Sequence, residues 1–270
     1  MKEYIITNKP NYYYYSNDKF DPNDFSVFYQ RLTKVSFKQG YTITTLGMIK
    51  DLPLLLLTQS QPVQGSNILI SSGFHGDEPA PCWAILRVLE KSKTLLKRCN
   101  ISFLPCVNPT GFQNNKRENV LGEDSNRGFF PDKGRSKSTE GNYLLQNKGT
   151  LKHLSEDAFM SMHESNKNSK FYISSIRNPD ENCYDIEKLL VSNGSKYIEV
   201  MDNQMIRRDG EDVMVNGGIT NTAVEDTFEN YLSKNGTPYS FCTETPTKSD
   251  FYKRVWLNME LIKTLICWIS

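Results

Sequence analysis

The chain has 270 residues, of which 38% are hydrophobic, 23% charged and 11% aromatic. This length fits one large globular domain or two small ones, and the composition argues against a disordered or fibrous chain. The formal net charge is +1, so the electrostatic signature of a nucleic-acid or anionic-membrane binder is absent. We expect residues 1–270 to form a single domain in which residues 1–40 wrap the surface.

The sequence also lacks the signals of export and membrane insertion. No apolar stretch near the N-terminus precedes a small-residue cleavage site, and the apolar runs, such as Leu54 to Leu57, are far too short to span a bilayer. The six cysteines form no Cys-x-x-Cys pair, which favours free thiols in a reducing compartment. We therefore expect a soluble cytoplasmic protein that contacts neither nucleic acid nor membrane; the sequence leaves its oligomeric state open.

Hydrophobic runs and turn residues predict strands and helices in alternation. In the first half we expect strands at 41–49, 53–59, 68–73 and 101–107, a helix ending at Lys91 that Pro79 and Pro81 open, and a turn at 108–111. In the second half we expect a long functional loop over 111–142 and a turn at 217–218. Strands are expected at 158–162, 171–175, 197–200 and 239–243. Helices are expected at 143–155, at 186–191 and from Asp250 to about Trp268, the last capped by Ser249. This order predicts an α/β domain with a mostly parallel central sheet.

Four polar residues fall where predicted strands end. They are His75, Asn108, His163 and Glu244. Ligands of open α/β sheets gather at the carboxyl ends of the strands, so this shared position predicts a site.

His75 and Glu78 stand three residues apart on a sharp turn between a strand and a helix. Zinc accepts imidazole nitrogen and carboxylate oxygen, and two histidines with one carboxylate leave a catalytic zinc one open position. Alone, such a pair is more often two polar residues on a surface turn. Its place after a strand and before a helix favours a metal site.

A third ligand must come from one of the other two histidines. His153 lies on a predicted helix beside Lys152, which is typical of a solvated residue. His163 ends a strand, where a ligand and a histidine bonded to a backbone carbonyl are equally reasonable. Taken together with His75 and Glu78, the ligand interpretation of His163 is the better one.

Hydrolysis also needs a proton acceptor and groups that bind anions. Glu244 follows an apolar strand and is the candidate proton acceptor, because burying a carboxylate that has no function is costly. Taken alone, a glutamate that points into solvent at the end of a strand is the simpler interpretation. Arg117, Asn126 and Arg127 lie in the long loop. Guanidinium groups can stabilise an oxyanion or hold a substrate carboxylate, although loop arginines usually face solvent.

In this order, the pieces resemble the zinc carboxypeptidase family. The matching segments are His75-Gly76-Asp77-Glu78, Asn108-Pro109-Thr110-Gly111, Arg117, Asp124-Ser125-Asn126-Arg127, His163 and Glu244, spread over residues 68 to 247. The resemblance implies a three-layer α/β/α fold with a mixed, mostly parallel sheet of about eight strands between helices. It implies one catalytic zinc held by His75, Glu78 and His163, and a water that this zinc activates.

The resemblance also assigns the remaining roles. Arg117 would stabilise the oxyanion, Asn126 and Arg127 would bind the substrate carboxylate, and Glu244 would act as general base. The implied activity is that of a metallocarboxypeptidase, a protease that cuts the peptide bond next to a free carboxylate. The substrate-binding tyrosine of the digestive enzymes has no assigned equivalent among Tyr231, Tyr239 and the others.

Two alternatives remain. Succinylglutamate desuccinylase and aspartoacylase share this fold and metal set, remove N-acyl groups from amino acids, and have a similarly short spacing between the two arginines. They tend to read Asp-Leu-His-Thr at the third ligand, where this chain reads Ser161-Met162-His163-Glu164, so we favour the peptidase. A non-catalytic binding protein on the same fold is less well supported, because every expected catalytic position is filled. No Gly-rich phosphate loop indicates a nucleotide enzyme.

Overall fold

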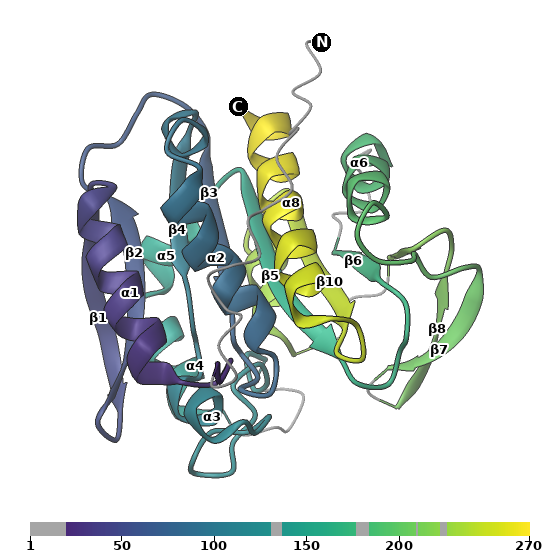
Figure 1. Ribbon diagram of the computed structural model, residues 1–270, viewed down its shortest axis with the longest axis horizontal. Coiled ribbons are helices and arrows are strands. Elements are labelled where there is room, and N and C mark those ends of the chain that lie inside the picture. Colours follow the sequence, from purple (N-terminus) through teal and green to yellow (C-terminus); the bar gives the residue numbers. More distant parts are fainter. Residues whose placement is uncertain (1–19, 131–136, 177–183, 209, 222–225) are drawn as a thin grey trace.

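A computed structural model describes residues 20–130, 137–176, 184–208, 210–221 and 226–270. Its centre is an eight-stranded sheet with the strand order β1-β2-β4-β3-β5-β10-β6-β9 (Figure 1). The strands are β1 (Tyr41–Ile49), β2 (Leu52–Gln59), β3 (Asn67–Ser72), β4 (Asn100–Leu104), β5 (Ala158–Ser165), β6 (Tyr172–Ile176), β9 (Ile219–Thr220) and β10 (Tyr239–Pro246). A separate hairpin pairs β7 (Gln204–Arg208) with β8 (Glu211–Val215).

The central sheet is mixed and mostly parallel, as the sequence predicted. The pairs β3–β4, β3–β5, β5–β10 and β6–β9 are parallel, whereas β1–β2, β2–β4 and β6–β10 are antiparallel. The parallel core places the carboxyl ends of β3, β4, β5 and β10 along one edge, where such sheets bind ligands.

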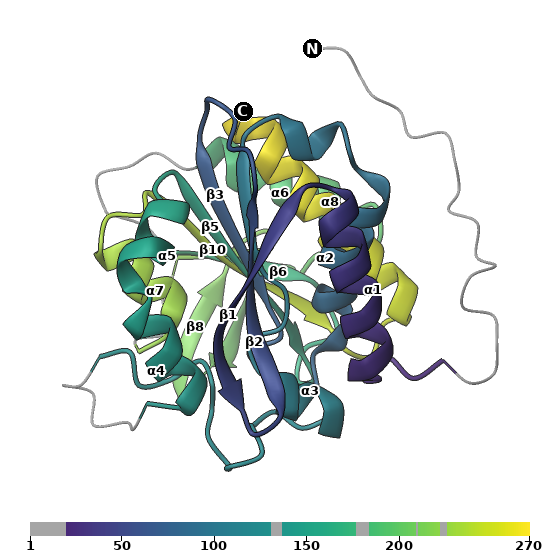
Figure 2. The ribbon, with the colours of Figure 1, turned by 90° about the vertical axis from the view of Figure 1, so that its left-hand side faces the viewer.

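Helices cover both faces of the sheet. The helices are α1 (Phe25–Lys38), α2 (Pro79–Lys91), α3 (Pro109–Asn114), α4 (Thr139–Gln146), α5 (Lys148–Leu154), α6 (Tyr184–Gly194), α7 (Phe228–Lys234) and α8 (Phe251–Ile269), with a short 3-10 turn at Leu95–Lys97. One face carries α1, α2 and α8, and the other carries α4, α5 and α7 (Figure 2). The expected three-layer α/β/α architecture is therefore confirmed.

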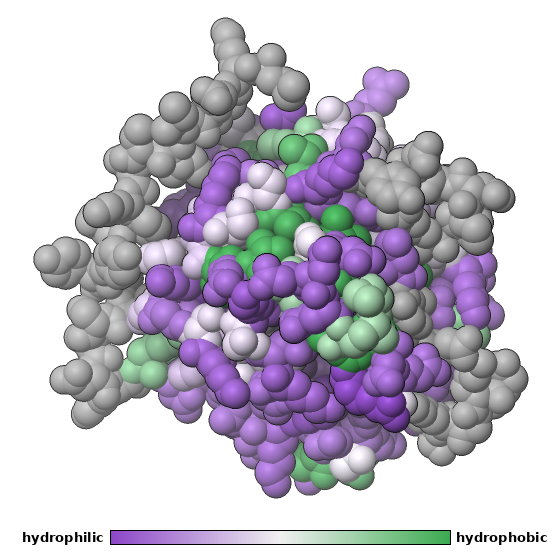
Figure 3. All heavy atoms as spheres, turned by 90° about the vertical axis from the view of Figure 1, so that its right-hand side faces the viewer, coloured by the Kyte–Doolittle hydropathy of each residue, from purple (hydrophilic) through white to green (hydrophobic). Residues whose placement is uncertain are grey.

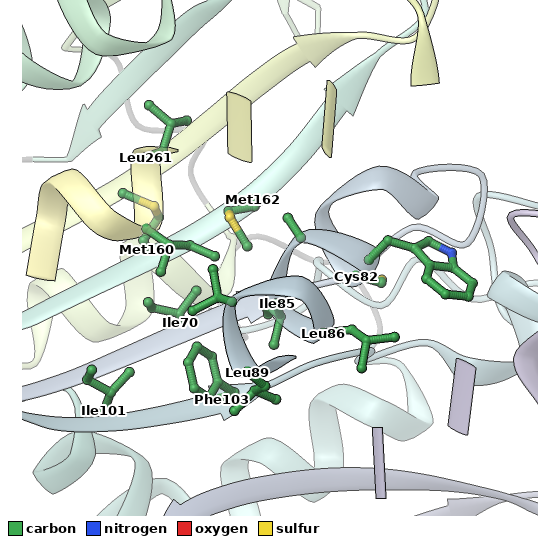
Figure 4. Close-up of a cluster of buried hydrophobic side chains, with 14 of the residues drawn as sticks. Ile70, Cys82, Ile85, Leu86, Leu89, Ile101, Phe103, Met160, Met162 and Leu261 are labelled. Carbon is green, nitrogen blue, oxygen red and sulfur yellow. The ribbon is translucent and has the colours of Figure 1, made fainter. Parts of the chain in front are cut away.

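Apolar side chains fill the space between sheet and helices on each face. On the α2 face, Ile85 and Leu89 of the helix meet Ile70, Phe103 and Met160 of the strands, all fully buried (Figure 4). Burying a side chain of this size stabilises the fold by about 1.5–3 kcal/mol relative to exposure. This packing fixes α2, and thus the turn that precedes it, against β3 and β5.

Several predicted boundaries are wrong for local reasons. Asp250, not Ser249, caps α8, because its carboxylate accepts a hydrogen bond from the Lys253 amide at 3.0 Å. The expected helix at 143–155 is two helices that meet at Asn147, which is the C-cap of α4 and the N-cap of α5 and whose side chain donates to the Tyr143 carbonyl at 2.8 Å.

Other expected elements are shorter or absent, and some were missed. The strand expected at 101–107 ends at Leu104, and the strand expected at 197–200 is reduced to one bridge between Val200 and Phe171. The turn at 108–111 continues into α3, while residues 115–130 form turns only, as a long loop predicts. The hairpin β7–β8 and helix α7 were not predicted.

The segment 1–40 is described only in part. Residues 25–38 form α1, which buries Phe28 and Leu32 against the domain, while residues 1–19 lie outside the described part of the chain. In the described residues, no helix combines the length and hydrophobicity needed to cross a bilayer. The cytoplasmic location stays a prediction.

The turn between β3 and α2 packs backbone to backbone on α3. A Cβ atom added to Gly76 would lie 1.8 Å from the carbonyl carbon of Gly111. Asn23 ties the two segments together by donating to the carbonyls of Gly76 and Phe112. Gly76 therefore leaves room for the backbone of Gly111 and Phe112, whereas a Cβ atom at Gly111 would meet the side chain of Asn108.

We expect Gly76→Ala to lower the free energy of unfolding by about 2 kcal/mol, because the new methyl group must push α3 away. Denaturant unfolding measures this change. Gly149→Ala is the matched control, since a Cβ atom there meets nothing within 4 Å and alanine favours the helix. Equal stability of the two variants would contradict the close packing at Gly76.

Candidate metal centre

The edge of the parallel sheet brings together residues that are far apart in the sequence. His75 and Glu78 lie on the turn after β3, and His163 and Glu244 lie near the ends of β5 and β10. His163 and Glu244 are direct partners in the parallel register of these strands. Neighbouring strands lie about 4.8 Å apart, so the predicted base stands beside the predicted ligand.

Three side chains converge on one point. His75 Nδ1 lies 2.7 Å from Glu78 Oε1, and His163 Nδ1 lies 2.9 Å from Glu78 Oε2. The two Nδ1 atoms are 3.3 Å apart, and each of the three residues is at most 4% exposed. Among the described residues, this trio is one of two groups compact enough to hold a metal ion.

The outer nitrogens of both imidazoles face other polar atoms. His75 Nε2 lies 3.3 Å from Asp124 Oδ1, and His163 Nε2 lies 2.9 Å from Ser161 Oγ. Partners in these positions favour the tautomer that carries its proton on Nε2, which leaves the Nδ1 lone pair for a metal. Tetrahedral zinc with ligands at 2.0–2.2 Å places donor atoms about 3.3 Å apart, which matches the two imidazoles. The donor set fits zinc.

The charges of these buried groups change one another's pKa values. Burial alone would lower the pKa of His75, but the carboxylates of Glu78 and Asp124 raise it to about 9. Burial would raise the pKa of Glu78, yet the two imidazoles hold it well below its usual range. The pKa of Asp124 is likewise lowered against the effect of burial, mainly by its hydrogen bond to His75. A proton on His75 thus takes the place of a cation.

The trio opens into a cavity of about 340 Å³. Its polar lining includes Asp77, Arg117, Asp124, Asn126, Arg127, Lys167, Tyr172, Arg208, Glu229, Cys242 and Glu244 besides the three metal donors. The predicted ligands, the predicted base and the predicted anion receptors therefore lie around one cavity. Asn108, which also follows a strand, does not line it, because its side chain caps α3 by accepting a hydrogen bond from the Gly111 amide at 2.7 Å.

The predicted anion receptors differ in how they are held. The Arg117 side chain is 38% exposed, donates to Asp124 at 2.9 Å and lies 3.2 Å from His75 Nδ1. Arg127 is 9% exposed and donates to the carbonyl of Asn126 at 2.8 Å.

Asn126 is bound on both sides of its amide. Its nitrogen donates to Glu229 at 3.1 Å, and its oxygen accepts from the Phe228 amide at 2.9 Å. In this conformation Asn126 orients the loop around the site.

Glu244 has the environment of a proton acceptor. Burial raises its pKa, and Arg208 opposes that rise with a nitrogen 3.6 Å from Glu244 Oε1. A general base must be ionised when it acts, and the charge of Arg208 favours the ionised form. It must also be basic enough to take a proton, and burial makes the carboxylate more basic.

Arg208 and Glu229 also line the cavity and were not predicted, because they lie on β7 and α7, which hydrophobic patterning did not reveal. Of the tyrosines, Tyr172 lines the cavity, whereas Tyr231 packs against Phe228 and Tyr239 against Trp268. The solvated role expected for His153 is confirmed by its side-chain exposure of 70%.

Glu164, the residue after the third predicted ligand, links the site to two helices. It accepts a hydrogen bond from the Ala80 amide at 2.9 Å and pairs with Arg254 of α8. Glu78 occupies the N-cap position of α2, but its side chain makes no capping bond. Glu164 thus satisfies the first turn of α2 and leaves the Glu78 carboxylate available to a metal.

The comparisons with known proteins place the chain in a family. The catalytic-domain model of succinylglutamate desuccinylase/aspartoacylase matches residues 64–189. A crystal structure described as a "putative metallopeptidase" from Shewanella denitrificans OS217 is 31% identical, covers 92% of each chain and has a TM-score of 0.83. The chain belongs to the metallopeptidase family that this structure represents. The desuccinylase/aspartoacylase match ties this family member to that branch, as the short arginine spacing predicted.

Other structures extend the likeness. A second "putative metallopeptidase", from Shewanella amazonensis SB2B, is 29% identical, covers 92% of this chain and 94% of its own, and has a TM-score of 0.85. A metallo-carboxypeptidase from Burkholderia cenocepacia shares the fold at 13% identity, with a TM-score of 0.66 over 88% of this chain and 67% of its own. No curated protein matches the chain in sequence.

We expect the zinc affinity to depend steeply on pH. Because the pKa of His75 in the metal-free protein is about 9, zinc must displace a proton at neutral pH. The zinc association constant should therefore rise about tenfold per pH unit between pH 6 and 8. Competition with a chelator measures it, and His163→Ala should abolish this tight binding. A flat profile, or equal zinc in wild type and variant, would contradict the ligand set.

We expect Glu164→Ala to weaken both the fold and the metal site. The change leaves Arg254 buried without its carboxylate, which should cost about 3 kcal/mol of unfolding free energy. Zinc affinity should fall about tenfold because the turn carrying Glu78 loosens. Glu90→Gln, in the partly exposed Arg31–Glu90 pair, is the control and should cost less than about 1 kcal/mol. Unchanged zinc affinity in Glu164→Ala would show that Glu164 does not help to position Glu78.

Proposed function

We propose that the protein is a zinc-dependent metallocarboxypeptidase, which hydrolyses a peptide bond next to a free carboxylate. One observation carries the proposal: two imidazoles and a carboxylate converge within 3.3 Å at the sheet edge, beside Glu244 and a cavity with several guanidinium groups. That combination supplies a metal site, a proton acceptor and anion receptors in one place.

His75, Glu78 and His163 would hold the ion. When bound, zinc polarises the scissile carbonyl and lowers the pKa of water toward neutrality. Glu244 takes the proton of the attacking water on a carboxylate oxygen and passes it to the departing nitrogen. Arg117, exposed at the cavity, donates to the carbonyl oxygen as negative charge develops there.

The free carboxylate of the substrate needs its own receptor. Arg127 lines the cavity from the loop after α3, and we assign it this role together with Asn126. The contact of Asn126 with Glu229 is compatible with this role if the amide reorients on binding. Substrates would then be short peptides or peptide termini with an uncapped carboxyl group.

A second candidate is an N-acyl amino acid deacylase. It is favoured by the desuccinylase/aspartoacylase catalytic-domain model, which matches residues 64–189. Both reactions cleave an amide next to a carboxylate with the same residues. They differ in what lies on the acyl side: a peptide in one case, a small acyl group in the other.

We expect zinc-loaded protein to cleave a blocked dipeptide acid, but to cleave its C-terminal amide at least about 100-fold more slowly. The amide cannot pair with Arg127, so the pocket loses a charge-assisted contact. Release of free amino acid measures both rates, and an N-acetyl amino acid assayed alongside tests the deacylase alternative. Equal rates for acid and amide would refute the assigned carboxylate receptor.

Glu244→Gln separates this chemistry from contaminating activity. It removes the proton acceptor and leaves His75, Glu78 and His163 intact, so zinc content should stay the same while the rate falls at least about 100-fold. Near-normal turnover in this variant would show that another group is the base.

A further inference from the structure

The residues assigned to anion recognition stand on a segment without helix or strand. Arg117, Asn126 and Arg127 all lie within residues 115–130, where the chain makes only turns and bends. A receptor binds well when its donors are already in place, because ordering them during binding costs affinity. The contacts that fix this segment therefore decide how well the cavity recognises a carboxylate.

Asn119 is the centre of this segment. Its side-chain oxygen accepts hydrogen bonds from the backbone amides of Leu121 and Glu123 at 2.9 and 3.0 Å. Its side-chain nitrogen donates to the carboxylates of Glu123 and Glu140 at 2.8 Å each, and the residue is only 4% exposed. The amide nitrogen thus makes one bond within the segment and one to a residue outside it.

Glu140, the residue outside the segment, belongs to a well-packed element. It stands in the first turn of α4, and Tyr143 of this helix packs so closely on β1 that a Cβ atom at Gly47 would lie 2.3 Å from its ring. The same turn lies against the receptor segment, because a Cβ atom at Gly141 would lie 3.9 Å from the Arg127 carbonyl oxygen. Glu140 therefore joins the segment to a helix that the sheet supports.

A carboxylate is a costly choice at this position if packing is its only role. Glu140 is fully buried, and the groups of the described chain that shift its pKa include no cation. Burial raises its pKa, and its own backbone amide, the Asn119 amide and the Ser125 hydroxyl oppose that rise. An apolar side chain would avoid the cost of removing a carboxylate from water. What the carboxylate adds is its contacts with the receptor segment.

We propose that Glu140 is a positioning residue for the carboxylate receptor. Through Asn119 it holds the segment that carries Asn126 and Arg127 in the arrangement that accepts the free carboxylate of the substrate. This deepens the proposed function and rests on it. Glu140 does not line the cavity, so it touches neither metal nor substrate. Its effect must therefore appear in the recognition of the carboxylate and not in the chemistry at the metal.

The test compares a blocked dipeptide acid with its C-terminal amide on zinc-loaded full-length protein. We expect Glu140→Ala to lower kcat/KM for the acid about tenfold, mainly through KM, and to change the value for the amide less than about twofold. Glu140→Gln keeps an oxygen that can accept from Asn119, so it should stay within about threefold of wild type. Zinc affinity should not change in either variant, because Glu140 contacts none of the metal donors.

A double-mutant cycle shows whether Glu140 acts through Arg127. Arg127→Gln alone should lower kcat/KM for the acid about 100-fold. Adding Glu140→Ala should lower it less than about twofold further, because the receptor is already lost. Losses that multiply would mean that Glu140 acts on another part of the site.

Glu187→Ala is the matched control for a purely structural role. Glu187 is also fully buried near the start of a helix, but its helix α6 packs on β6, whereas α4 packs on β1 at the opposite end of the sheet. The α6 side of the molecule has a mainly hydrophilic surface around a limited hydrophobic area (Figure 3). Glu187→Ala should lower stability and leave the ratio of acid to amide rates unchanged. An equal fall of that ratio in both variants would mean that it follows stability.

A milder variant covers the case in which Glu140→Ala does not fold. Glu140→Asp keeps the charge but draws the acceptor back by one methylene group, and it should lower the ratio of acid to amide rates at least about threefold. An unchanged ratio in a folded Glu140→Asp or Glu140→Ala variant, or equal losses for acid and amide, would overturn the role given to Glu140.

A binding measurement keeps the inference separate from the proposed reaction. Calorimetry in the Glu244→Gln background, where turnover is blocked, should show tighter binding of the dipeptide acid than of its amide. Adding Glu140→Ala should reduce that difference about tenfold. Lack of hydrolysis of every substrate by the wild type would defeat the proposed function alone, whereas an unreduced difference in binding would defeat the role of Glu140.

Discussion

The site depends on electrostatic repulsion and attraction among three buried donor atoms. Two imidazole nitrogens face each other at 3.3 Å with a carboxylate beside them, and all three residues are nearly excluded from water. Lone pairs so close repel unless a proton or a cation lies between them. The raised pKa of His75 reflects the same effect, because the neighbouring carboxylates favour its protonated form. The fold must therefore hold the three donor atoms together against the repulsion of their lone pairs. Several contacts around the site keep them in place.

The donors are held in place by contacts on the side that faces away from the cavity. Packing of Gly76 on Gly111 fixes the turn from one side, and the Glu164 bond to the Ala80 amide fixes the start of α2 from the other. His163 and Glu164 are adjacent on β5, so they point to opposite faces of the sheet. One faces the cavity and the other anchors the helix that follows Glu78. A single strand thus positions two of the three ligands.

The sequence could predict that His75, Glu78 and His163 lie together, because each stands near the end of a regular element. His75, Glu78, His163 and Glu244 follow apolar strands or precede a helix, and parallel strands bring their carboxyl ends together. Arg208 and Glu229 could not be found this way. Arg208 lies on a polar hairpin whose clearest signal, Asp209-Gly210 between two short runs with alternating apolar residues, is easily passed over. Glu229 lies in a seven-residue helix, too short for hydrophobic periodicity to identify.

This difference divides the cavity into parts with separate structural origins. His163 and Glu244 stand on strands of the central sheet, where a shift of one residue would turn every side chain to the other face, and His75 and Glu78 stand on the turn that follows β3. Arg208 stands on a hairpin with its own small core, which includes Tyr172 of β6. Its side chain contacts Ser174 of β6 and Cys242 of β10 and lies 3.6 Å from Glu244 Oε1, so the hairpin is linked to the strand that carries the predicted base. A substitution that removes the Arg208 charge would therefore act on the pKa of Glu244 as well as on the charge of the cavity.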